Sequence, residues 1–244
     1  MRLVCYDLET NGFHGSILQF SFKGYDLINE KRIDFSDYVN PNEELNRYAA
    51  EIHGISSPNL AQMDSFEGKK NLITGVLRGA ILVGFNNQVF DDIRLAKELG
   101  VSVHEMNQQL RFNLDVMRLC NQKGIAGSLE EIANRAGYQN PFPHNAKGDV
   151  ETTLRLLFSL IKEELVELPQ GIGLTESEML TLIEKSVDMD DDAYLIIENE
   201  SVQMYDSLIA ADEIVQFGPY AGKSMAELRE LDEHLWRQLG GTDD

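Results

Sequence analysis

The chain has few cysteines, no long apolar run and little positive charge, and each shortage excludes a class of protein. Its two cysteines, Cys5 and Cys120, lie far apart and in no C-x-x-C spacing, so a disulfide framework is excluded. No apolar stretch reaches the roughly 20 residues of a membrane span, and strand-like sequence from residue 3 leaves no room for a signal peptide. We therefore expect a cytoplasmic protein that does not contact a membrane.

The shortage of positive charge is uneven along the chain. The formal net charge is −20, which by itself argues against a protein that coats a long nucleic acid. Residues 1–165 carry 22 acidic against 17 basic residues, whereas residues 166–244 carry 19 against 4. This shift coincides with a Pro- and Gly-containing stretch, VELPQGIGLTE. We predict one domain over 1–165 and a small acidic α+β module over 166–244.

The pattern of apolar residues in the first part predicts an α/β domain with a mixed sheet. Three strands come first, and the short connections between them favour antiparallel pairing. A wholly apolar run, AILVGFN, then indicates a strand that is buried on both faces. The strands are expected at the N-terminus and over 16–28, 31–39 and 80–86, and the helices near 43–52, 66–78, 90–99, 128–137 and 147–164.

Two carboxylates at the end of the first strand require an explanation. Asp7 and Glu9 are two residues apart in YDLETNG, and a strand projects such residues to one side at a spacing of about 7 Å. Two anions at the rim of a core repel each other and resist desolvation. A third group must neutralise them.

Further acidic residues and a histidine lie at comparable places. Asp91 and Asp92 follow the buried strand in FNNQVFDDIRL, and PHNAKGDVETTLRLL places His144 on a loop and Asp149 early in a helix. Taken singly, acidic residues in a first helical turn usually interact with the helix dipole, and a loop histidine is usually a surface residue. Together they occupy strand ends and helix starts, where α/β folds build their active sites.

These motifs resemble those of the DEDD-type 3′–5′ exonucleases of the ribonuclease H-like fold, in the subclass with a histidine five residues before the last aspartate. YDLETNG, GFNNQVFDD and HNAKGDVETT are similar to the family's three motifs, and the second is most similar to that of bacterial exonuclease I. EIHGIS is similar to a segment that often precedes the second motif. The sequence departs from many relatives at Asn86, where they carry histidine, and at Asn11.

The resemblance implies a metal-dependent nuclease. Four carboxylates would hold two divalent cations, Mg²⁺ or Mn²⁺, and His144 would be the general base; the carboxylates are Asp7, Glu9, Asp91 and Asp149. Hard cations prefer carboxylate oxygens, and two of them stabilise the attacking and leaving oxygens of a phosphoryl displacement. An imidazole with a pKa near 6.5 can accept a proton from the attacking water near neutral pH. Four residues are expected to contact the terminal nucleotide, namely Leu8, Thr10, Phe13 and Asn87.

Several alternatives remain open from the sequence. Phe13 is either a platform on which a base stacks or a core residue. The substrate is expected to be the 3′ end of single-stranded DNA, with an exoribonuclease or oligoribonuclease acting on RNA as the alternative. A different class is an interaction protein whose acidic tail docks on a basic partner. The intact set of four acids and a histidine argues against a purely structural role.

The C-terminal segment carries a second, shorter resemblance. FGPYAGKSM has too few residues between its glycines for a phosphate-binding loop. The stretch from Phe217 to Leu239 instead resembles a small module at the C-terminus of bacterial exonuclease X, in which Lys223 is the best candidate for a phosphate contact. The pattern predicts helices over 174–187 and 224–239 and a hairpin over 193–205.

Overall fold

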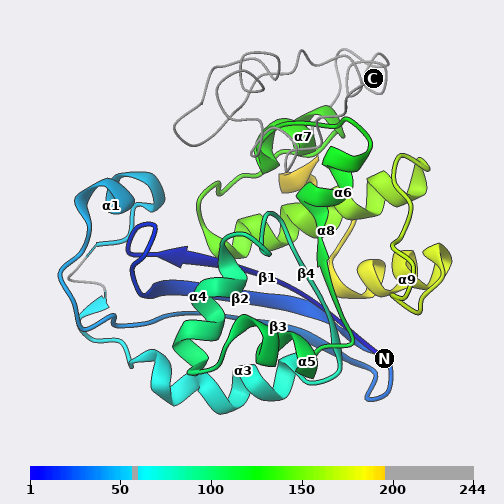
Figure 1. The fold of residues 1–244 in the computed structure, drawn as a ribbon. Coiled ribbons are helices and arrows are strands. Elements are labelled where there is room, and N and C mark those ends of the chain that lie inside the picture. The colour runs from blue at the N-terminus through cyan, green and yellow to red at the C-terminus, as the bar shows by residue number, and fades with distance from the viewer. Residues whose placement is uncertain (57–59, 196–244) are drawn as a thin grey trace, which may run out of the picture.

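The protein is built around a mixed five-stranded sheet in the order β3-β2-β1-β4-β5 (Figure 1). The computed structural model describes residues 1–56 and 60–195. The first three strands pair antiparallel, whereas β1, β4 and β5 run parallel, so the carboxyl ends of these three meet at one edge. The strands are β1 (Arg2–Thr10), β2 (Ile17–Asp26), β3 (Lys31–Tyr38), β4 (Ala80–Gly84) and β5 (Phe112–Asp115).

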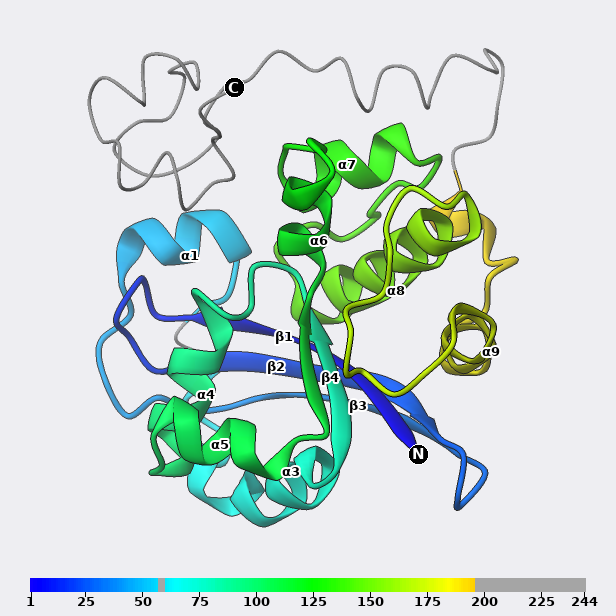
Figure 2. The same cartoon turned by 45° about the vertical axis from the view of Figure 1, so that its right-hand side comes forward.

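Helices cover both faces of this sheet, as Figures 1 and 2 show. Helices α3, α4 and α5 pack on one face of the sheet, and helices α6 to α9 pack on the other. No helix in the described ranges is long and apolar enough to cross a membrane. The helical segments are α1 (Arg47–His53), η1 (Phe66–Lys69), α3 (Lys70–Leu77), α4 (Asp91–Leu99), α5 (Val103–Gln109), α6 (Val116–Gln122), α7 (Leu129–Arg135), α8 (Ala146–Lys162), α9 (Glu176–Ser186) and η2 (Asp192–Tyr194).

The central strand β1 divides the core into two clusters. Leu3 and Cys5 belong to the cluster that packs against α8, whereas Val4, Tyr6 and Leu8 belong to the cluster on the opposite face. This is the period of two that a strand buried on both faces requires. The predicted mixed α/β sheet with flanking helices is therefore confirmed.

Two short helices were not predicted from the sequence. Helices α5 and α6 have seven residues each, too few for a clear 3.6-residue period. A local signal was present for α5, because Ser102 and Glu105 form a capping box. The helix predicted near 43–52 begins later, at Arg47, because the side chain of Asn46 caps it.

Residues 166–195 pack on the domain that was predicted for residues 1–165. Buried side chains of this segment join the same cluster as Leu3 and Cys5, and α9 confirms the helix predicted over 174–187. Among the described residues, the shift in charge at residue 166 therefore marks no change of core, and the division into 1–165 and 166–244 stays a prediction. The first residues of the hairpin predicted over 193–205 belong to the 3₁₀ helix η2 instead. The rest of that hairpin lies outside the described residues, as do the helix predicted over 224–239 and Lys223.

A buried network of charges fixes the end of the described chain. Arg155 of α8 is fully buried, donates to Glu151 at 3.2 Å and to the backbone carbonyl oxygens of Asp188 and Met189. Glu151 in turn accepts from Lys23 of β2. Each buried charge thus has an opposite charge or a dipole beside it, which its removal from water requires.

We predict that Arg155→Leu lowers the free energy of unfolding by about 3 kcal/mol, because Glu151 and two carbonyls lose a buried donor. The matched control is Arg47→Leu, which removes an exposed pair with Glu51 at the same i,i+4 spacing and is expected to cost under about 0.5 kcal/mol. Urea unfolding of both variants measures the difference. Equal costs would show that the buried network does not hold the fold.

Candidate active site

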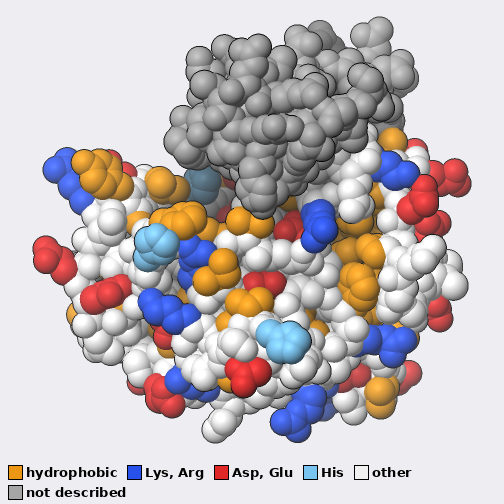
Figure 3. Space-filling model, viewed as in Figure 1, with side chains coloured by type: hydrophobic (Ala, Val, Ile, Leu, Met, Phe, Trp, Pro, Cys, Tyr) orange, Lys and Arg blue, Asp and Glu red, His pale blue; other side chains and the backbone are white. Residues whose placement is uncertain are grey.

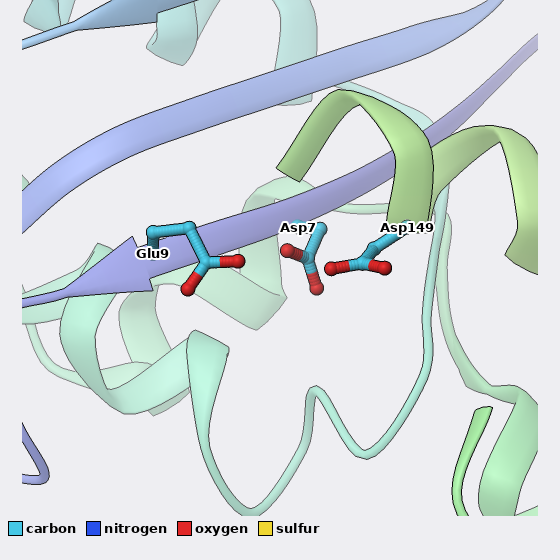
Figure 4. A group of neighbouring side chains, drawn as sticks. All are labelled: Asp7, Glu9 and Asp149. Carbon is cyan, nitrogen blue, oxygen red and sulfur yellow. The ribbon is translucent and has the colours of Figure 1, made fainter. Parts of the chain in front are cut away.

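Three carboxylates converge at the carboxyl end of β1. Asp7 and Glu9 extend from one side of the strand, and Asp149 points toward them from the first turn of α8 (Figure 4). One oxygen of each lies within 4.8 Å of those of the other two. A strand and a helix that are far apart in the sequence therefore build one anionic cluster.

The turn before α8 sets the position of Asp149. The side chain of Asn145 caps the helix by accepting from the backbone N–H of Lys147 at 3.2 Å. Gly148 lies so close to this turn that a Cβ atom would be 2.6 Å from the carbonyl oxygen of Phe142 and 2.7 Å from Oδ1 of Asn140. Only glycine lets the loop close against the first turn of the helix.

The doubled aspartate at the start of α4 divides into two roles. Asp92 is satisfied inside the protein, because the hydroxyl of Tyr6 donates to its Oδ1 at 2.5 Å and Nδ2 of Asn113 donates to its Oδ2 at 2.6 Å. Asp91 is buried as well, yet its Oδ1 has no hydrogen-bond partner among the described residues. A buried oxygen that accepts nothing indicates a missing ligand. Asp92 is therefore structural, and Asp91 is free to bind a cation.

The four carboxylates share an unfavourable environment. Burial raises the pKa of Asp7 well above its usual value, and the neighbouring carboxylates raise it further. Burial and repulsion from Asp149 raise the pKa of Glu9 to about 8, and burial and repulsion from Glu130 raise that of Asp149 to about 7. Burial also raises the pKa of Asp91, with repulsion from Asp92 as the next cause. The group cannot be fully ionised near neutral pH without a positive charge in its midst.

A divalent cation fits this environment. Among the described residues, none of the four carboxylates forms a salt bridge with a lysine, arginine or histidine. The donor set is all oxygen, which suits Mg²⁺ and Mn²⁺. Oδ1 of Asp91, which has no hydrogen-bond partner among the described residues, supplies a further acceptor. This answers why anions accumulate at the end of β1.

His144 lies at the entrance rather than within the cluster. It is exposed in the turn before α8, with a left-handed backbone (φ 58°). Its backbone N–H interacts with the carboxylate of Asp149 and lowers the pKa of that group. The imidazole is therefore tethered beside a predicted ligand while its side chain faces solvent.

Of the four residues predicted to contact a nucleotide, only Phe13 is accessible, with 65% of its surface exposed. The alternative that Phe13 is a core residue is therefore wrong. Leu8 packs in the core, and the buried Thr10 hydroxyl donates to the carbonyl oxygen of Gly12 at 3.1 Å. Asn87 is fully buried and donates to Oδ1 of Asn113 at 2.8 Å. The side chains of Leu8, Thr10 and Asn87 are therefore buried in the scaffold, and their contact with a nucleotide stays a prediction.

One residue with a direct role in the geometry escaped the sequence analysis. Nδ2 of Asn140 donates to Oδ1 of Asp149 at 2.5 Å, while Oδ1 of Asn140 accepts from the backbone N–H of Phe142 at 3.0 Å. Asn140 therefore fixes the orientation of Asp149 and the turn that leads to His144. No local pattern marks it, because the contact depends on how the loop folds back on α8.

Two further residues approach the cluster. Glu130, half-buried in the first turn of α7, repels the carboxylates of β1 and Asp149 strongly enough to raise their pKa values. His53, from the EIHGIS segment, is turned so that Nδ1 accepts from the backbone N–H of Ile55 at 3.0 Å, and its Nε2 is buried with no partner among the described residues. Burial lowers the pKa of His53, and the charge of His144 lowers it further. The EIHGIS segment thus reaches the site.

The sequence profile of a family described as exonuclease matches residues 4–157. The match spans more than half of the chain, so the chain belongs to this exonuclease family, and the resemblance seen in the motifs is confirmed. The chain is 28% identical over 179 residues to the 3′-5′ exonuclease DinG of Bacillus subtilis (strain 168), a match that covers 69% of the chain and 18% of DinG.

Solved structures show the same fold. The complex of E. coli exonuclease I with a dT13 oligonucleotide superposes with a TM-score of 0.56 at 21% identity, covering 66% of this chain and 41% of that one. The zinc-bound form of an E. coli exonuclease I complex with single-stranded DNA gives a TM-score of 0.57 at 19% identity, covering 67% and 41%. These likenesses confirm the predicted ribonuclease H-like fold. The chain spans less than half the length of each of these relatives.

We predict that Asp149→Asn stabilises the metal-free protein at pH 8 and has little effect near pH 4. The usual pKa of an aspartate is 3.8, whereas that of Asp149 in the folded protein is about 7. At a pH between these two values the folded protein holds a proton that the unfolded chain releases, so stability falls as the pH rises through this window. Removing the charge should recover on the order of 2 kcal/mol. Urea unfolding across pH 4 to 8 measures the gain, and Asp64→Asn, at an exposed position, is the control. Added Mg²⁺ should stabilise the wild type at pH 8 more than the variant.

A second prediction concerns Asn140. Asn140→Ala should weaken the affinity for Mn²⁺ by roughly 10- to 100-fold, because residues that orient a metal ligand have effects of this size. Calorimetric titration with Mn²⁺ measures the affinity, and Asn134→Ala, at an exposed position of α7, should leave it unchanged. An unaltered affinity in Asn140→Ala would show that Asp149 needs no support.

Proposed function

We propose that the chain is a metal-dependent 3′–5′ exonuclease that hydrolyses phosphodiester bonds at the 3′ ends of single-stranded DNA. The observation that carries the proposal is the convergence of Asp7, Glu9 and Asp149, with the unpartnered oxygen of Asp91, at the carboxyl edge of the sheet. Membership of an exonuclease family and the 3′-5′ exonuclease activity named for the B. subtilis relative support it.

The residues divide the chemistry among them. The four carboxylates would hold two ions, Mg²⁺ or Mn²⁺, which when bound stabilise the charge that develops on the attacking and leaving oxygens. His144 would accept the proton of the attacking water, because its imidazole is exposed and can act as a general base. Its turn, tied to Asp149 through the backbone, keeps the base next to the ligands.

Single-stranded DNA is the substrate that the comparisons favour. Two of the structurally similar proteins are E. coli exonuclease I complexes with single-stranded DNA. On the face drawn in Figure 3, Lys and Arg side chains are interspersed with acidic ones, which suits an enzyme that grips a few phosphates at one strand end. RNA is the alternative substrate, since no residue is assigned to a 2′-hydroxyl. A basic protein remains a proposed partner of the acidic segment, which extends beyond the described residues.

We predict that Asp7→Ala abolishes digestion, because the cation loses a central ligand. His144→Ala should lower the turnover by roughly 10²- to 10⁴-fold while Mn²⁺ affinity stays near that of the wild type. The assay follows a 5′-labelled single strand with Mg²⁺ or Mn²⁺, beside matched duplex DNA and RNA. His104→Ala, on an exposed position of α5, is the control for the histidine.

The outcomes separate the parts of this proposal. Wild-type digestion in excess chelator would exclude the metal mechanism, and an unchanged rate in His144→Ala would remove the histidine from it. Faster digestion of RNA than of DNA would replace the substrate. No digestion of any strand would favour the interaction protein.

A further inference from the structure

A buried arginine joins the two segments that carry Glu9 and Asp91. Arg94 lies on α4 and is only 4% exposed. It donates through one guanidinium nitrogen to the carbonyl oxygen of Phe90 at 2.8 Å and through the other to the carbonyl oxygen of Phe13. Phe90 directly precedes Asp91, and Phe13 lies in the loop that follows β1. The guanidinium therefore fastens this loop to the start of α4.

The same guanidinium lies against two aromatic rings. Its carbon is 3.9 Å from the centroid of the Phe90 ring and 4.6 Å from that of Phe13. The two rings also meet edge to face, with centroids 5.7 Å apart. A cation at this distance from an aromatic face is attracted by the ring quadrupole, so Arg94 holds Phe13 by both its backbone and its ring.

Arg94 has no carboxylate partner that would explain its burial. In the described ranges no Asp or Glu oxygen lies within salt-bridge distance of its nitrogens. Burial lowers its pKa, although the charge of Asp91, the residue after Phe90, opposes this shift. A buried charge without an ion pair costs stability. Its hydrogen bonds and ring contacts are all directed to Phe13 and Phe90, which indicates that their placement is what it secures.

Phe13 is the accessible member of this group. Although Arg94, Phe90 and His14 contact it, its ring remains 65% exposed. A large aromatic ring that is fixed from behind and open to solvent is suited to stacking on a base. It lies in the loop that follows the strand of Glu9 and contacts Phe90, the residue before Asp91.

We propose that Arg94 is a positioning residue that holds the Phe13 ring as the stacking surface for the base of the 3′-terminal nucleotide. This rests on the proposed function, because it assumes that a strand end enters the site. Stacking accepts any base, since every base has a π-face. The pair therefore sets how firmly a strand end is held, not which sequence is cleaved.

The test uses a single strand with 2-aminopurine at its 3′ end and phosphorothioate linkages that slow cleavage. Stacking quenches 2-aminopurine, so binding to the wild-type protein should dim it, whereas the same base at the eighth position from the 3′ end should dim less. Phe13→Ala should lose the quenching and raise KM about tenfold, and Phe13→Tyr should retain both. Arg94→Met, which keeps the length but no donor or charge, should lose the quenching as well, and Arg94→Lys should recover it in part.

A double variant shows whether the two residues act together. If Arg94 acts through Phe13, Arg94→Met combined with Phe13→Ala should raise KM no more than Phe13→Ala alone. Additive effects, or full quenching by Arg94→Met, would overturn the proposal while digestion by the wild type leaves the proposed function standing. Urea unfolding verifies that Arg94→Met is folded; should it unfold, full quenching by Phe13→Ala, at an exposed position, still overturns the stacking role.

Discussion

The repulsion among carboxylates at the end of β1 is the constraint on which the rest of the structure depends. Four carboxylates from three separate elements meet there, namely Asp7, Glu9, Asp91 and Asp149. Burial and the neighbouring carboxylates raise the pKa of each of them, so none is stabilised by the others. Without a cation the group opposes folding, so the scaffold must hold it together by other means. The two cores on either face of β1 supply that stability, because Leu3 and Cys5 anchor α8 while Leu8 and its neighbours anchor α4.

The supporting residues each hold one ligand in place without competing for the cation. Asn140 donates to Oδ1 of Asp149 and so fixes the orientation of its carboxylate. Asp92 takes the hydrogen bonds of Tyr6 and Asn113, so that its neighbour Asp91 keeps an oxygen without a partner. The hydrogen bonds therefore distinguish the two aspartates, because Asp92 is fixed inside the protein whereas Asp91 is the one proposed as a ligand.

The sequence predicted the members of the cluster better than their surroundings. Strand alternation and the motif order pointed to Asp7, Glu9 and Asp149, which converge in the structure, because these positions depend on local periodicity and on the edge of a parallel sheet. The role of Asp91 as a fourth ligand stays a prediction. Leu8 was expected to contact the substrate, yet its side chain is buried, and the same alternation, applied once more, turns it away from Asp7. Asn140 could not be found, since its contact with Asp149 arises from a loop closing on Gly148, which is a matter of tertiary packing.

The acidic end of the chain is also tied to the site. The segment held by Arg155 continues to Tyr194, whose carbonyl oxygen accepts from the backbone N–H of Gln139 at 3.0 Å, and Gln139 precedes Asn140. The last described residues are thus linked to Asp149 through Gln139 and Asn140, so the packing of residues 166–195 and the position of this carboxylate depend on each other.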